Sequence, residues 1–375
     1  MITLGQYLFT IRNSAGLTRT LGRIDLCRDA DGQPCFTAGN SAVVFRIRHR
    51  GRTCALRCYT HPPRHLAEIY GERLLRNELY VYRDAAHGEW TDVVLDEWIE
   101  GDTLHDRIAA ADATEFARLA ASFDRMAAEL VASECAHGDL KPENIVVTPD
   151  GTMRTIDRDA MFLPSMAHRE SPELGTAAFQ HPARTASDFD ARIDDFPAAL
   201  ISTALHALAL EPGLRERYGV HDTLIIDPQR LDADPALDAI LALFERQGNA
   251  LRYRIARLLR AGTLRLPRLA ALLDHAVRPP RHVGPEPPEL YESQGLWGYR
   301  PTIPPLYDCG FEFTEGLAAV RLGRTWHYID AEGRTAIRCP GCEAVKPFRN
   351  GRAVVLRDGV RRSVGRDGKF GELEY

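Results

Sequence analysis

The sequence has no long hydrophobic run. No apolar stretch reaches the roughly 18 residues that a membrane-spanning helix needs. The opening stretch MITLGQYLFTIRNSAG also lacks a basic region followed by an apolar core, which a secretory leader would have. We therefore expect a cytoplasmic protein that does not enter a membrane.

A strong charge of one sign is also missing. The 47 Lys and Arg residues are set against 52 Asp and Glu residues, and the formal net charge is −5. Such a chain has no overall electrostatic attraction to nucleic acid or anionic lipid, so any basic site must be local. The eight cysteines are scattered and form no disulfide framework, which a chain of 375 residues with 45% hydrophobic content does not need.

The pattern up to about residue 98 is typical of strands with one helix among them. The stretch from Cys35 to Thr60 has two β-rich runs on either side of HRGR, which predicts an antiparallel hairpin. Residues 63–76 space their apolar side chains as a helix would, and residues 78–83 and 92–101 return to strand character.

From residue 112 onward the sequence becomes helical. Asp112 is placed to cap a helix that runs to about residue 134, with its apolar side chains along one stripe. Further helices are predicted over residues 196–210 and 235–262. The stretch RPPRHVGPEPPE, residues 278–289, contains five prolines, which predicts an exposed linker and a domain boundary.

An internal repeat follows the linker. The stretch EGLAAVRLGRTWHYIDAEGR is echoed by NGRAVVLRDGVRRSVGRDGK, with Gly316 matched to Gly351 and Gly333 matched to Gly368, a repeat of 35 residues. This pattern predicts short strands separated by glycine turns.

The most informative motif is AHGDLKPENIVV, residues 136–147. If a helix ends before it and a strand begins at Ile145, Asp139 and Asn144 lie on one tight loop. The apolar stretch in MRTIDRDAMF then predicts a second strand ending at Asp157, which would place another oxygen ligand beside Asn144. Two such ligands suit Mg²⁺, and Lys141 is placed to neutralise a phosphoryl group in transfer.

This stretch resembles the catalytic loop of protein kinases, H-R-D-L-x-x-x-N followed by D-F-G, and DLKPEN is similar to the serine/threonine type. The resemblance implies that His137 is the loop histidine, that Asp139 orients or deprotonates the acceptor hydroxyl, and that Lys141 is the transition-state cation. It also implies that Asn144 and Asp157 are the metal ligands.

Three flanking stretches resemble other parts of a kinase. ELGTAAFQHP resembles the end of an activation segment, and DDFPAALI resembles the start of a long buried helix where Asp194 would brace the catalytic loop. WIEGDTL resembles the hinge, which implies that the backbone of Glu97 and Trp98 lies near an adenine ring.

The expected nucleotide-binding strands match the kinase pattern in part. GNSAVVFRI resembles the second half of a glycine-rich loop, with Gly39 and Ala42 at glycine positions and Val44 above the base. In CALRCYT the strand lysine is replaced by Arg57, with Ala55 two residues before it. Arginine keeps the charge but has a different shape, and losing one preorganised contact costs about 2.7 to 4 kcal/mol, which a slow kinase would survive.

Several regulatory positions also depart from the family. The helix glutamate that would pair with Arg57 is assigned to Glu72, with Glu68 as the alternative. HGD lacks the arginine that meets a phosphorylated activation loop, Asp159 stands where D-F-G has glycine, and QHP replaces the APE motif. We therefore expect a divergent bacterial-type branch that is not activated by loop phosphorylation.

The C-terminal repeats resemble WG repeats. GLWGY, residues 295–299, carries the Trp-Gly pair, and TWHYIDAEG is a diverged second copy. The resemblance implies an interaction module that selects a protein partner, and we expect its tryptophans to pack small β cores.

Two further features of this region are ambiguous. Cys339 and Cys342 form CPGC, which suits half a zinc site or a redox pair, but without a second pair we expect ordinary surface thiols. The run from Lys346 to Lys369 has eight Lys or Arg residues against two acidic ones. It could bind phosphates, although we expect a solvated face.

Together these features predict an α+β chain with a two-lobed kinase-like fold and a C-terminal all-β WG-repeat module. The expected parts are an N-terminal extension (1–29), an N-lobe (30–98), a C-lobe (99–277), the linker (278–289) and the repeat module (290–375).

The expected function is ATP- and Mg-dependent phosphoryl transfer to Ser or Thr hydroxyls of a protein partner, with no nucleic-acid partner. Two alternatives stay open. One is a pseudokinase scaffold that binds nucleotide without chemistry, which Arg57 and Ala42 favour. The other is a small-molecule phosphotransferase, because HGDL…N…D also resembles aminoglycoside and choline kinases.

Overall fold

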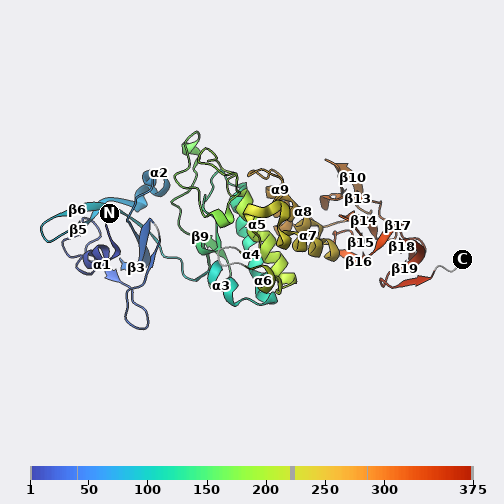
Figure 1. The fold of residues 1–375 in the computed structure, drawn as a ribbon, viewed down its shortest axis with the longest axis horizontal. Helices are drawn as coiled ribbons and strands as arrows, with labels where there is room; N and C mark the ends of the chain where they lie inside the picture. Colours follow the sequence, from blue (N-terminus) through green and yellow to red (C-terminus); the bar gives the residue numbers. More distant parts are fainter. Residues whose placement is uncertain (1, 40, 220–223, 285, 373–375) are drawn as a thin grey trace.

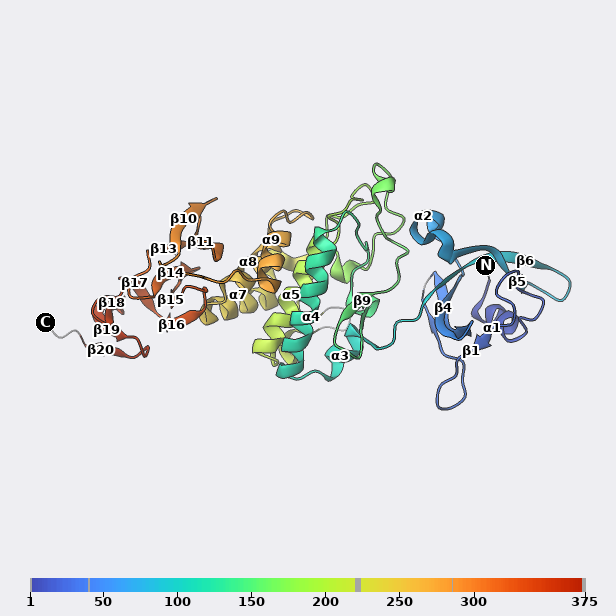
Figure 2. The same ribbon diagram turned by 180° about the vertical axis from the view of Figure 1, so that it is seen from behind.

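The computed structural model describes residues 2–39, 41–219, 224–284 and 286–372. The chain forms three bodies in a row: a sheet near the N-terminus, a body of helices, and a set of small sheets toward the C-terminus (Figure 1). Seen from behind, the helices again lie between the other two parts (Figure 2). In the part of the chain described, no helix is long and apolar enough to cross a bilayer.

The N-terminal body is a six-stranded antiparallel sheet in the order β1–β3–β4–β6–β5, with β2 paired to β3. The predicted hairpin is confirmed, since β3 and β4 pair across the turn between His49 and Arg52. The strands are β1 (Asp25–Leu26), β2 (Phe36–Ala38), β3 (Ala42–His49), β4 (Arg52–Tyr59), β5 (Leu74–Tyr82) and β6 (Gly88–Glu97).

Residues that alternate along β3 and β4 give this sheet two different faces. Phe45 and Ile47 are fully buried on one face, where they share a core with Tyr7 and Ile11 of helix α1 (Leu4–Arg12). The other face carries Arg57 and looks toward the helical body. Arg57 stands opposite Val44 on β3 and Val94 on β6.

Helix α1 was not expected from the sequence. Its first turn is closed by a capping box between Thr3 and Gln6. Residues after the helix are held by Glu78 of β5, which is 1% exposed and accepts hydrogen bonds from the backbone N–H groups of Thr20 and Leu21, both at 2.8 Å. The expected extension is thus folded against the sheet.

The predicted helix over residues 63–76 is much shorter in the structure. Helix α2 covers only Leu66–Tyr70, and a 3₁₀ turn, η1 (Gly71–Arg73), leads directly into β5. Gly71 has φ +53° and ψ −126°, a backbone conformation that does not continue a helix and that glycine adopts most readily. Leu74, counted with the helix in the sequence, begins the strand instead.

The helical body is built around α5, which is buried along most of its length and packs against α4. The prediction for α4 is confirmed, because the Asp112 side chain accepts a hydrogen bond from the Glu115 N–H at 2.8 Å. The helices are α3 (Leu104–Ala110), α4 (Ala113–Ala132), α5 (Asp195–Leu210), α6 (Leu214–Tyr218), α7 (Pro235–Gln247), α8 (Ala250–Leu258) and α9 (Leu269–Val277).

A small sheet and several single turns complete this body and carry the candidate site. The sheet has the order β7–β8–β9, with antiparallel pairing. The strands are β7 (Asp102–Thr103), β8 (Ile145–Val147) and β9 (Met153–Thr155), and the 3₁₀ turns are η2 (Pro142–Asn144), η3 (Pro164–Met166), η4 (Ala177–Phe179) and η5 (Pro228–Ala233).

The C-terminal region, called the β module from here on, contains three antiparallel sheets. The predicted glycine turns are confirmed: Gly316 and Gly351, one repeat apart, have φ +79° and +77°. The strands are β10 (Glu289–Ser293), β11 (Leu296–Arg300), β12 (Ile303–Tyr307), β13 (Cys309–Gly310), β14 (Ala318–Leu322), β15 (Thr325–Ile329), β16 (Thr335–Cys339), β17 (Cys342–Val345), β18 (Arg352–Arg357), β19 (Val360–Gly365) and β20 (Phe370–Glu372).

The tryptophan prediction is confirmed, while the cysteine prediction is wrong. Trp326 is buried in the module core, and Trp297 packs partly buried against the larger core. Cys339 and Cys342 are not surface thiols, since they are 0% and 4% exposed in the core of the module. Cysteine behaves here as a small hydrophobic side chain, and burial raises the pKa of both thiols.

The β module is fixed to the helical body by a continuous core. Leu306 and Tyr307 of β12 belong to the same hydrophobic cluster as α8. Polar contacts reinforce the junction: Arg254 of α8 donates to the Leu306 carbonyl at 2.6 Å, and Glu245 of α7 accepts from the Arg324 N–H at 2.7 Å. The proline-rich stretch after α9 therefore does not leave the module free to swing.

Asp124 joins three helices of the central body, and we predict that it is essential for stability. Its buried carboxylate accepts from Ser202 Oγ at 2.7 Å and lies 2.8 Å from His206 Nε2 and 2.7 Å from Arg252 Nη1. Asp124→Asn removes the buried counter-charge of Arg252 and should lower the free energy of unfolding by about 3 kcal/mol. Urea unfolding measures this change.

Asp238→Asn is the matched control, because Asp238 of α7 also pairs with an arginine, Arg260 in the turn after α8, but its side chain is 63% exposed. An exposed pair of this kind contributes less than about 1 kcal/mol. Equal losses in the two variants would show that burial of Asp124 is not what makes it important.

His327 predicts a pH dependence of stability. It is buried in β15, and burial together with the Arg338 charge lowers its pKa from 6.5 to about 4. The unfolded chain binds this proton near pH 6.5 and the folded chain only near pH 4, so stability is lost as the pH falls through that range. The loss should reach about 3 kcal/mol at pH 4.

The measurement is the unfolding free energy at a series of pH values for the wild type and His327→Gln. The variant should show a flatter slope between pH 4 and 6.5. His87→Gln, at a side chain that is 80% exposed, should keep the wild-type slope. Identical slopes in the wild type and His327→Gln would contradict the prediction.

Candidate functional site

The loop of residues 137–144, called the motif loop from here on, is fixed in place by the start of α5. The N–H groups of His137 and Gly138 both donate to the buried carboxylate of Asp194, the latter at 3.0 Å, so the predicted bracing role of Asp194 is confirmed. Gly138 has φ +82°, and a Cβ there would lie 2.1 Å from the Ala160 carbonyl oxygen. Only glycine fits this position. His137 Nε2 lies 2.7 Å from the Ile156 carbonyl oxygen.

Asp139 lies at the centre of a compact polar cluster. Its Oδ1 accepts from the Thr176 N–H at 2.6 Å, and its Oδ2 lies 3.1 Å from both Asn144 Nδ2 and Lys141 Nζ. Lys141 Nζ also donates to Thr176 Oγ1 at 2.7 Å. Burial raises the pKa of Asp139, but the Lys141 charge and the Thr176 hydrogen bonds outweigh it and lower that pKa below its ordinary value. Asp139 is therefore ionised at neutral pH.

Asn144 and Asp157 come from neighbouring strand ends. The Ile156 N–H donates to the Asn144 carbonyl oxygen at 2.8 Å, which brings the residue after Ile156 next to η2. Asp157 has φ +60°, an uncommon conformation for a residue other than glycine. In the described part of the chain there is no group of three or more His, Cys, Asp or Glu side chains suited to a metal ion.

Arg57 reaches across from β4 to this segment. Its Nη1 donates to Asp157 Oδ1 at 2.7 Å and to Asp159 Oδ2 at 2.8 Å. Burial lowers the pKa of the guanidinium, but the Asp157 carboxylate, with Tyr70 and Asp159, outweighs burial and raises it. The N-terminal sheet and the helical body therefore meet through a charged contact in which Arg57 and Asp159 are largely out of water, while the Asp157 side chain is 42% exposed.

Asp159 is the most enclosed member of this contact. It is 2% exposed, and its Oδ1 accepts from Tyr59 Oη at 2.9 Å and from Tyr70 Oη at 2.7 Å. We call Arg57, Asp157, Asp159, Tyr59 and Tyr70 the clamp. Burial raises the pKa of Asp159 above its ordinary value.

The expected glutamate partners of Arg57 are corrected by this geometry. Glu72 lies in the exposed turn η1 beyond the end of α2. The Glu68 carboxylate instead accepts a hydrogen bond from Arg169 Nη1 at 2.9 Å. A helix that ends at Tyr70 is too short to present Glu72 toward β4. The two carboxylates of the clamp take the place of the glutamate.

The remaining predicted nucleotide-binding residues lie on β2 to β6. The Gly39 N–H donates to the Ala42 carbonyl oxygen at 2.8 Å and closes a tight turn, whose Asn40 is outside the described residues. Ala42, Val44 and Ala55 lie on the same sheet face as Arg57, and Ala42 is 4% exposed in a core with Tyr59.

The two predicted hinge residues end β6 and follow it. Glu97 pairs with Arg154 at 2.8 Å, and the Arg46 guanidinium lies 5.2 Å from the centre of the Trp98 ring. Both contacts involve side chains, so they leave the backbone role expected for Glu97 and Trp98 untested.

Several residues that build the site were missed in the sequence. Thr176 and the two clamp tyrosines make contacts that no local pattern encodes. Arg184, which is 7% exposed, donates from Nη1 to the Gly138 carbonyl oxygen at 2.8 Å and so holds the motif loop from the side. The available sequence signals were the spacing of Tyr59 and Arg57 on one face of a strand and the stretch ELGTAAFQHP, which contains Thr176.

Comparison with known proteins bears on the β module. A family model described as WG containing repeat matches residues 300–326, which run from the end of β11 into β15. The match supports the expected WG repeats and says nothing of residues 1–299. A search of the curated proteins finds no match.

We predict that Asp159 is the main stabilising member of the clamp. Asp159→Ala leaves two buried tyrosine hydroxyls without their acceptor and Arg57 with one carboxylate instead of two. The free energy of unfolding should fall by about 3 to 5 kcal/mol. Chemical denaturation measures the loss, and limited proteolysis should show faster cleavage between the two bodies.

Glu68→Ala is the control for this experiment. The Glu68–Arg169 pair also joins α2 to the segment after β9, but both side chains are more than a third exposed. Its loss should change the free energy of unfolding much less than the loss of Asp159 does. A Glu68 effect as large as that of Asp159 would count against the clamp.

Proposed function

We propose that the protein transfers the γ-phosphoryl group of ATP to a Ser or Thr hydroxyl of a protein partner, with a two-lobed kinase-like arrangement of the N-terminal sheet and the helical body. The observation that carries the proposal is the cluster of Asp139, Lys141, Asn144 and Thr176 beside Asp157, facing Arg57 across the junction. A polar turn without a function would not need four mutually bonded polar groups at strand ends.

Asp139 is suited to orient the acceptor hydroxyl. A carboxylate offers about four lone-pair sites, and the contacts with Thr176, Asn144 and Lys141 use three of them. The remaining site would accept the hydroxyl hydrogen and take the proton as the new O–P bond forms and the bond to ADP breaks. Lys141 would counter the charge on the phosphoryl oxygens.

The oxygen donors present fit Mg²⁺. Asn144 uses its Nδ2 for Asp139, so its amide oxygen points elsewhere, and Asp157 uses Oδ1 for Arg57 and has Oδ2 as a second oxygen. Hard oxygen ligands in this number suit Mg²⁺, which keeps several waters and binds phosphates as well. A bound Mg²⁺ would neutralise charge on the phosphates. Arg57 has further N–H donors in its fork for the phosphates.

A second function is favoured by one observation. Arg57 is already held by Asp157 and Asp159, so the side chain expected to meet phosphate and the carboxylate expected to meet metal engage each other. A chain that keeps this pairing with nucleotide bound would be a nucleotide-binding scaffold without turnover. The intact cluster around Asp139 is the argument against it.

The β module would bind the protein partner. Support comes from the family match to a WG containing repeat and from the fixed junction between the module and α7–α8. A rigidly placed module holds a partner at one orientation to the rest of the chain, which favours selection of the substrate.

The test is incorporation of labelled phosphate from Mg-ATP into the protein and into generic protein acceptors. Asp139→Asn should lower the rate by roughly 10²- to 10⁴-fold while Mg-ATP binding is kept. Asp157→Ala should abolish both the incorporation and the Mg-dependent binding. Asp150→Asn, an exposed carboxylate in the turn between β8 and β9, should change neither.

The outcomes separate the candidates. No incorporation by the wild type, together with Mg-ATP binding that Asp157→Ala removes, would replace phosphoryl transfer with the scaffold function. Absence of Mg-ATP binding in the wild type would overturn both.

A further inference from the structure

The last sheet of the β module, β17 to β20, has one buried face and one outward face. Ala353 and Val355 of β18 lie in the module core. Because successive strand residues point to opposite faces, Arg352 and Val354 point outward. Val354 stands opposite Ser363 of β19, so that serine lies on the outward face as well.

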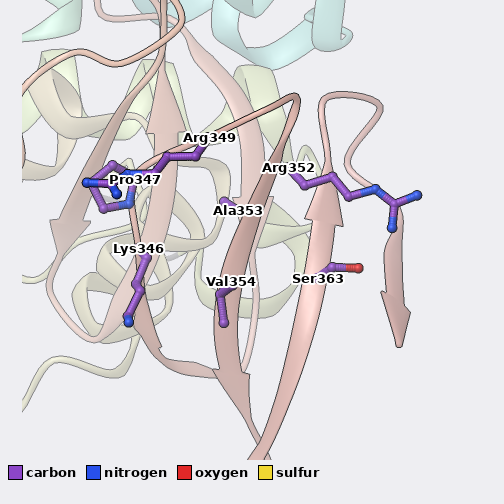
Figure 3. Close-up of a pocket in the computed structure, with 7 residues that line it drawn as sticks. All are labelled: Lys346, Pro347, Arg349, Arg352, Ala353, Val354 and Ser363. Carbon is purple, nitrogen blue, oxygen red and sulfur yellow. The ribbon is translucent and has the colours of Figure 1, made fainter. Parts of the chain in front are cut away.

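A hollow of about 600 Å³ lies on this sheet (Figure 3). Such a volume is typical of pockets that enclose a small ligand or a few side chains. Its lining, taken over the described residues, is cationic and apolar, with one hydroxyl group and no acidic residue: Lys346, Pro347, Arg349, Arg352, Ala353, Val354 and Ser363.

The three cations of the hollow have no carboxylate partner. In the part of the chain described, no ion pair is formed by Lys346, Arg349 or Arg352, nor by Arg361 or Arg362 of β19, whereas Arg366 pairs with Glu315 and Lys369 pairs with Asp367. Three unpaired cations around one concavity, in a chain of net charge −5, create a local attraction for an anion. The solvated face expected from the sequence therefore contains a hollow whose positive charges are not paired with carboxylates.

We propose that this hollow binds a phosphorylated segment of a partner protein. Phosphate presents several strong acceptor oxygens, which guanidinium groups such as those of Arg349 and Arg352 recognise through paired N–H donors. The Ser363 hydroxyl already donates to the Glu372 carbonyl oxygen at 3.1 Å, so the cations alone would supply the donors. The proposal goes beyond phosphoryl transfer and does not depend on it.

The apolar part of the lining favours a peptide over other sources of phosphate. Pro347 and Val354 would contact side chains next to the phosphorylated residue, which a free phosphate ion does not have. Among the residues that the structure describes, no aromatic side chain lines the hollow, so these residues offer no stacking surface of the kind on which single-stranded nucleic acids depend.

The hollow is separate from the candidate site around Asp139. The two lie in different bodies, with α4, α5 and α7 between β9 and β18 in both views (Figures 1 and 2). Binding to the hollow can therefore be measured on the full chain without interference from nucleotide chemistry.

The experiment is fluorescence anisotropy of the full chain with a short dye-labelled Gly/Ala peptide that carries one phosphoserine. Binding should be saturable and should weaken with salt. Arg352→Gln and Lys346→Gln should each weaken it by about tenfold or more, the effect of losing one charge-assisted hydrogen bond. Both positions are exposed, and unchanged melting temperatures would show that the variants are folded.

Lys369→Gln is the matched control, because Lys369 lies beside the same sheet but is 86% exposed and paired. It should leave the affinity unchanged. The proposal is overturned if the unphosphorylated peptide binds equally well, or if Lys369→Gln weakens binding as much as Arg352→Gln. It is also overturned if inorganic phosphate or a single-stranded oligonucleotide binds more tightly than the phosphopeptide.

Discussion

The contact of Arg57 with Asp157 and Asp159 is the interaction on which the candidate site depends. Arg57 belongs to the N-terminal sheet, and both carboxylates follow β9 in the helical body. Separating the two bodies would break the charge-assisted hydrogen bonds of Arg57 and would remove the Arg57 counter-charge from the buried Asp159. The contact therefore fixes the end of β9 against the sheet, and with it the position of Asp157 beside Asn144.

The departures from the kinase pattern are physically coupled. Arginine in place of lysine extends farther from β4 and needs counter-charge in a buried setting. Asp159, at the position where the pattern has glycine, supplies that counter-charge, and the hydroxyls of Tyr59 and Tyr70 occupy its other oxygen. A helix glutamate is then unnecessary, which agrees with an α2 that stops at Tyr70. Arg57, Asp159 and the absence of a helix glutamate partner are therefore explained by one structural arrangement.

Local patterns predicted the elements whose cause is local. The Asp112 cap, the hairpin of β3 and β4, and the repeat of glycine turns all depend on residues close together in the sequence, and each is present. The length of α2 was missed because apolar spacing continued past Gly71, while the backbone conformation at that glycine ended the helix. The motif spacing placed Asp139 and Asn144 together. Thr176 reaches Asp139, and Arg184 reaches Gly138, only through tertiary packing, which no short pattern encodes.

The shared core between β12 and α8 has a consequence for any partner of the β module. Because the module cannot swing, a segment held on β18 and β19 would keep a constant distance and direction from Asp139. The two lie in different bodies, separated by helices of the central body (Figure 1). A partner bound in the hollow would reach the candidate site only if it extended along the helical body or were itself part of a large assembly. Under the two proposals, the cations of the hollow would select the partner, and the site around Asp139 would react with its hydroxyl group. These would be separate steps, carried out by residues that do not touch.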